Sequence, residues 1–97
     1  MREDARRMHE ADVRGWLADF DAAARRIDRA ERVLLPLARE RREAALAAYQ
    51  GARGELGPVL EAERAITETE LGLVQALAER AKAWANLNFL YPHEMAR

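Results

Sequence analysis

The sequence lacks the residue types on which much enzyme chemistry depends. It contains no cysteine and no serine among its 97 residues, so disulfides, thiolate ligands and serine nucleophiles are all excluded. No Gly-x-Gly-x-x-Gly or Walker-type phosphate-binding pattern appears either. Its carboxylates lie among arginines at helical spacing, which is typical of a solvated face. We therefore predict a protein that is not an enzyme, with no catalytic residue, no cofactor and no bound metal.

The chain also lacks an excess of either charge and any long hydrophobic run. The chain has 16 basic and 17 acidic residues, whereas a nucleic-acid-binding module shows a clear basic excess. No apolar run approaches the roughly 20 residues that cross a bilayer. The first residues, Met1 to Arg7, have no apolar signal-peptide core. We predict no nucleic-acid partner, no direct membrane insertion by this segment and no signal peptide in the chain.

Turn-forming residues are scarce and gather in one place. Three of the five glycines and one of the three prolines fall within residues 51–58, which predicts a single turn. On both sides of that turn, apolar residues recur at steps of three and four, as on one face of an amphipathic helix. Before the turn they are Val13, Trp16, Phe20, Ile27, Leu34, Leu37 and Tyr49; after it they are Val59, Ile66, Leu73, Leu77, Trp84 and Leu87.

This pattern predicts an all-α fold, a long antiparallel helical hairpin of coiled-coil type. Gly57 is expected to cap the second helix and Pro58 to occupy its first position. The predicted boundaries are one domain over 1–91, helices over about 4–50 and 58–91, a turn over 51–57 and a flexible tail over 92–97.

Pro36 interrupts the first predicted helix. Proline removes a hydrogen bond to the carbonyl of Arg32 and disfavours helix at Leu35. Either the helix kinks near Pro36, which we favour, or it splits to give three helices. Alanine supplies 21 of the apolar residues, and two helices leave much of the remaining apolar surface wet. Self-association, to a dimer or higher, is therefore expected.

Two pairs of residues invite functional readings that have simpler alternatives. His9 and His93 fall toward the open end of the hairpin, where a two-histidine metal site is conceivable; we favour two solvated histidines. Trp16 and Trp84 lie on the apolar stripes, and we interpret them as core anchors rather than as a ligand cage.

The residues around the turn resemble the last helical hairpin of TolC-like outer-membrane efflux proteins, most closely the heavy-metal and drug-efflux branch. That family commonly shows Leu-Leu-Pro, then Ala-Ala-Leu-x-Ala-Tyr, a Gly-Arg-Gly turn and Val-Leu-Asp-Ala. The similarity covers about residues 13–90. The segments that carry it here are Leu34-Leu35-Pro36, Ala44-Ala45-Leu46-Ala47-Ala48-Tyr49, Gly51-Ala52-Arg53-Gly54 and Val59-Leu60-Glu61-Ala62-Glu63-Arg64.

The resemblance implies a fragment of the periplasmic α-barrel of a trimeric efflux channel in the outer membrane. This segment is then periplasmic, has no transport activity alone, and forms the tip that docks the periplasmic adaptor (membrane fusion) protein of an export pump. The sequence departs from the family at Gly51-Ala52, which reverses the usual order, and at Gly57-Pro58. The implied docking residues are Tyr49, Gly51, Ala52, Arg53, Gly54 and Glu61.

Two alternatives stay open from the sequence. The alternative to a channel fragment is a self-contained cytosolic hairpin that dimerises into a four-helix bundle as a scaffold or regulatory partner. The alternative to a docking role for the turn is that its glycines serve only to supply the positive φ that a tight turn needs.

Overall fold

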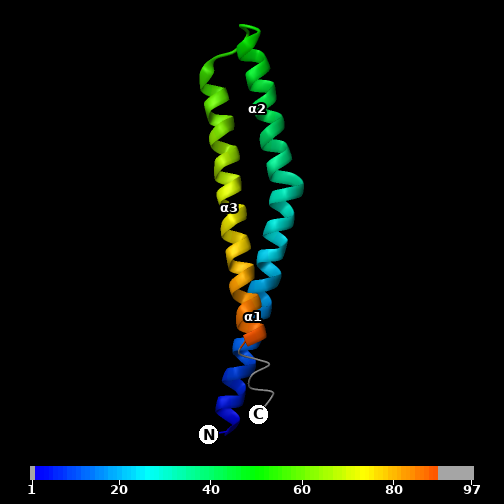
Figure 1. Cartoon of the computed structure of the whole chain (residues 1–97), viewed down its shortest axis with the longest axis vertical. Helices are drawn as coiled ribbons and strands as arrows, with labels where there is room; N and C mark the ends of the chain where they lie inside the picture. Colours follow the sequence, from blue (N-terminus) through cyan, green and yellow to red (C-terminus); the bar gives the residue numbers. More distant parts are fainter. Residues whose placement is uncertain (1, 90–97) are drawn as a thin grey trace. The chain divides into compact units, whose positions relative to one another are not determined.

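The computed structural model describes residues 2–89, and all of its regular structure is helical. The chain forms α1 (Arg2–Arg29), a π-helical turn η1 (Ala30–Leu34), α2 (Leu35–Gln50) and α3 (Leu56–Phe89) (Figure 1). The first three elements follow one another without a break, and residues 51–55 turn the chain into α3. The predicted antiparallel hairpin of two long helices is therefore confirmed. No helix of the described part combines the length and apolar character needed to cross a membrane.

The predicted start of the second helix and the prediction that Gly57 caps it are wrong. The second helix begins at Leu56 rather than at residue 58, so Gly57 and Pro58 lie in its first turn. Proline is tolerated there because the first-turn amides have no intrahelical acceptor. The predicted end of this helix at residue 91, the tail 92–97 and His93 lie outside the described residues.

The chain divides into two units, each with its own packing. One contains residues 26–75, with η1, α2, the turn and the first part of α3; the other contains residues 2–25 and 76–89. In the first unit, Leu35 and Ala38 pack with Ile66, all three at most 7% exposed, and the half-buried Leu73 joins them. This small cluster is the core that joins α2 to α3.

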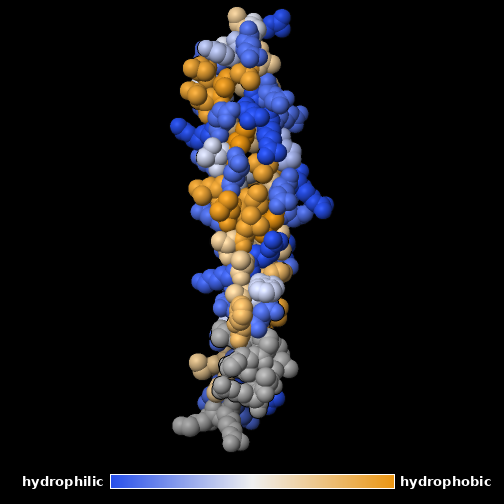
Figure 2. All heavy atoms as spheres, in the orientation of Figure 1, coloured by the Kyte–Doolittle hydropathy of each residue, from blue (hydrophilic) through white to orange (hydrophobic). Residues whose placement is uncertain are grey.

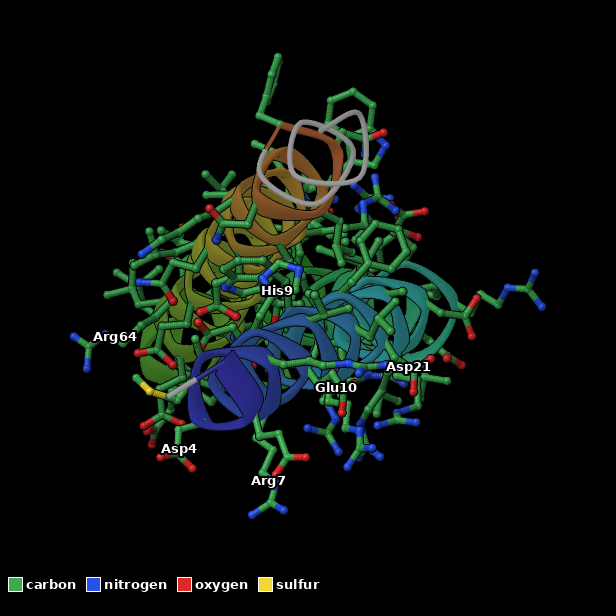
Figure 3. The ribbon with its side chains drawn as sticks, turned by 90° about the horizontal axis from the view of Figure 1, so that it is seen from below. Asp4, Arg7, His9, Glu10, Asp21 and Arg64 are labelled. Atoms are coloured by element: carbon green, nitrogen blue, oxygen red, sulfur yellow. The ribbon has the colours of Figure 1, made fainter. Side chains whose placement is uncertain are left out.

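The second unit is built on alanine. Its buried residues are Ala23, Ala76 and Ala83, each at most 3% exposed. Trp16 is half-buried, but Trp84 is 52% exposed and makes an edge-on ring contact with Phe89, at a ring-centroid distance of 6.5 Å. The interpretation of Trp84 as a core anchor is therefore wrong. Charged side chains cover the outside of α1, where Figure 3 shows Arg7 pointing away from the ribbon.

The π-helical turn η1 resolves the alternatives at Pro36. The Leu35 amide donates to the carbonyl of Ala30, five residues earlier, where an α-helix bonds four residues back. The wider turn gives the proline ring room that a regular α-helix denies it. The helix therefore continues through Pro36, and the three-helix alternative is wrong.

The same turn changes which side chains face α3. One extra residue in a helical turn rotates everything after it by about 100°. Straight α-helical spacing from Ile27 predicts burial of Leu34 and Leu37, yet these are 37% and 40% exposed. Leu35 and Ala38 are buried in their place. The π turn thus explains why the residues predicted to be buried after Ile27 are wrong by one position.

A complete Schellman motif ends α2. The Arg53 amide donates to the Ala48 carbonyl at 2.8 Å, and the Ala52 amide donates to the Tyr49 carbonyl at 3.1 Å. The residue in the left-handed conformation is Ala52, with φ 57°, and no glycine has a positive φ. The alternative in which glycines supply the positive φ of this turn is therefore wrong.

Replacing Ala52 with glycine is expected to stabilise the protein by about 0.5–1 kcal/mol, because glycine adopts this conformation without the Cβ clash. Urea unfolding followed by circular dichroism measures the change. Gly54→Ala is the matched control of opposite sign, since its new Cβ would lie 3.1 Å from the Cβ of Ala48. A loss of stability in Ala52→Gly would contradict the strain assigned to Ala52.

Candidate docking site at the helical turn

The turn presents backbone and little side-chain bulk. Residues 51–55 are all exposed, and two of them are glycines. Gly51 could not take a larger side chain freely, because a Cβ there would lie 3.3 Å from the carbonyl oxygen of Ala47. The five-residue turn is consequently both compact and accessible.

The turn uses its own amides internally. Gly51 donates to Ala47 at 2.9 Å, Arg53 and Gly54 both donate to the carbonyl of Ala48, and Ala52 donates to Tyr49. These amides are therefore satisfied, as helix ends require. A partner at the turn would receive hydrogen bonds chiefly from the Arg53 guanidinium, which carries five donors in a planar fork.

The structure brings some of the sequence-predicted site residues together and separates one. Tyr49 lies in the last turn of α2, 45% exposed and adjacent to the Gly51–Gly54 segment. Glu61 is also exposed, but it lies further along α3, in a groove with Arg41, Ala45 and Ala62. Glu61 therefore belongs to a different surface from Tyr49 and Arg53.

An ion pair ties the two helices together beside the turn. The Arg42 Nε lies 3.7 Å from Glu63 Oε1, and the Arg42 side chain is one-third exposed. Arg25 with Asp21 and Arg32 with Asp28 instead pair at four-residue spacing within the first helical stretch. Exposed pairs of that kind contribute about 0.3–0.5 kcal/mol each. The Arg42–Glu63 pair joins α2 to α3 on the turn side of the cluster around Ile66.

Sequence reasoning missed an exposed apolar row on α3. Leu60, Leu71 and Val74 are 59%, 56% and 60% exposed, and none was singled out by the buried stripe. Figure 2 shows apolar surface interspersed with charged side chains. The signal was present, because these residues lie about one-third of a helix turn away from Ile66.

Comparison with known proteins gives no assignment. No protein-family model, no curated protein and no solved structure matches the chain.

Proposed function

We propose that this hairpin is the periplasmic tip of a TolC-like efflux channel and that its turn docks the adaptor protein of an export pump. The observation that carries the proposal is the exposed, small-residue turn between two long helices. It falls where the order of motifs in the sequence places the tip. The sequence resemblance suggests the channel and the adaptor as the parent protein and the partner. The geometry of the turn supports the proposal because its surface is suited to such a contact.

The physical case for docking rests on access and on one cation. A turn with two glycines and an alanine allows another helical tip to approach the backbone closely. Arg53 then offers donors to a carboxylate or to helix C-terminal carbonyls, and Tyr49 adds an exposed aromatic ring with a hydroxyl. Glu61 is left out of this contact set, because it lines a separate groove.

Arg53→Glu is expected to reduce cross-linking of the hairpin to the adaptor at least about tenfold, and to reduce efflux, in cells that assemble the intact pump. The magnitude follows from losing one charge-assisted hydrogen bond, about 1.5–3 kcal/mol. Helix content and the melting temperature should hardly change, because Arg53 is exposed.

Arg64→Glu provides the control. Arg64 is an exposed arginine on α3 that points away from the ribbon (Figure 3), and its reversal changes the net charge by the same amount. It should leave docking and efflux intact. Wild-type cross-linking and efflux in Arg53→Glu would remove Arg53 from the site and leave the turn a purely structural element.

A further inference from the structure

One face of the hairpin unit 26–75 carries two neighbouring hollows, which share no lining residue and which we treat together as one groove along the helices. On α3 its residues are spaced four, three, four and three apart, which keeps them on one helix face: Pro58, Ala62, Ala65, Thr69 and Gly72. On α2 and η1 they are Ala30, Leu34, Arg41 and Ala45. The part beside the π turn has a volume of about 330 Å³, and a Cβ on Gly72 would meet nothing within 4 Å.

The two rims of the groove carry opposite charge. Arg29 and Arg41 stand on the first side, and Glu61 and Glu68 stand on the α3 side. All four side chains are exposed. Leu34, at 37% exposure, and the half-buried Leu73 are the large apolar side chains that line it. The groove therefore combines an apolar floor with one basic and one acidic edge.

We infer that a second copy of this chain covers the groove, face to face, about a two-fold axis parallel to the helices. Such an axis sets α2 of one copy against α3 of the other, so each basic rim meets an acidic rim. A two-fold axis across the helices would set α2 against α2 and bring like charges together. The charge pattern thus selects the parallel dimer, a four-helix bundle with both turns at one end.

The size of the face sets the strength of this dimer. The groove runs along about 15 residues of each helix, or roughly 22 Å, and is two helix diameters wide. That gives roughly 900 Å² in total, below the about 1,600 Å² of a standard interface. Dimerisation is consequently weak, with half-association in the tens of micromolar, and it does not depend on adaptor docking at the turn.

Complementary charge reversal tests the pairing between copies. Arg41 and Glu61 line the same part of the groove, so Arg41→Glu and Glu61→Arg each set like charges across the dimer axis. By sedimentation equilibrium, each single variant should dimerise at least tenfold more weakly than wild type. A one-to-one mixture of the two should dimerise again, because only the mixed pair has opposite charges at both contacts.

Arg39→Glu is the matched control, an exposed arginine of α2 outside the groove lining. It should dimerise like wild type, and circular dichroism should show unchanged helix content in every variant. A wild-type chain that stays monomeric at about 100 μM would overturn the inference. So would a mixture no better associated than its two components, since a purely intrachain role for these charges gives that result.

Discussion

Ile66→Ala is expected to lower the free energy of unfolding by about 2–4 kcal/mol, a large share of the roughly 5–15 kcal/mol typical of folded proteins. Ile66 is the one buried side chain that α3 gives to the cluster with Leu35 and Ala38, and Leu73 beside it is only half-buried. Removing it loses burial and leaves a cavity, because its alanine neighbour cannot refill the space.

Urea unfolding followed by circular dichroism at low micromolar concentration measures this effect. Leu71→Ala on the same helix is the control, because Leu71 is 56% exposed and should cost less than about 0.5 kcal/mol. Equal losses in the two variants would mean that the cluster around Ile66 is not what joins the helices.

Pro36→Ala is expected to stabilise the protein by about 1–3 kcal/mol. Proline in a helix interior costs about 3 kcal/mol relative to alanine, and the π turn before it relieves part of that cost by widening the helix. Alanine restores the missing amide and removes the ring. The buried positions of Leu35 and Ala38 should persist, because the π turn also serves to point them at Ile66.

Thermal melting and the exchange rates of the amides between residues 30 and 40 distinguish the possible outcomes. Stabilisation with unchanged burial of Leu35 supports this account. A destabilised Pro36→Ala variant would instead mean that the proline itself holds the π turn in register, by restricting Leu35.

Much of the fold could be predicted because long apolar periodicity and a single cluster of turn residues leave few alternatives. The helices, their antiparallel order and the location of the turn all follow from spacing. Spacing did not predict which residues after Ile27 are buried. A π turn adds one residue to the helix, and the only trace of it in the sequence is the proline that follows. Ala52 shows a similar limit, because it adopts a left-handed conformation for which residue propensity favours glycine.

The candidate sites were predicted unevenly for a related reason. Tyr49 and Arg53 are exposed at the turn because a turn of this kind has no interior. The groove with Glu61 and Arg41 needed the structure, since it arises from the way two helices lie against each other. Single-helix periodicity describes one face at a time and does not specify which residues of a neighbouring helix complete a surface.

The turn at residues 51–55 also sets the order in which this part of the chain assembles. Arg42 and Glu63 are about 20 residues apart, and Ala38 and Ile66 about 30, so the entropy lost on closing each successive loop rises only slowly. Every later pair is brought close by the one before it. We therefore expect residues 26–75 to fold from the turn outward, so that strain at Ala52 affects the first step.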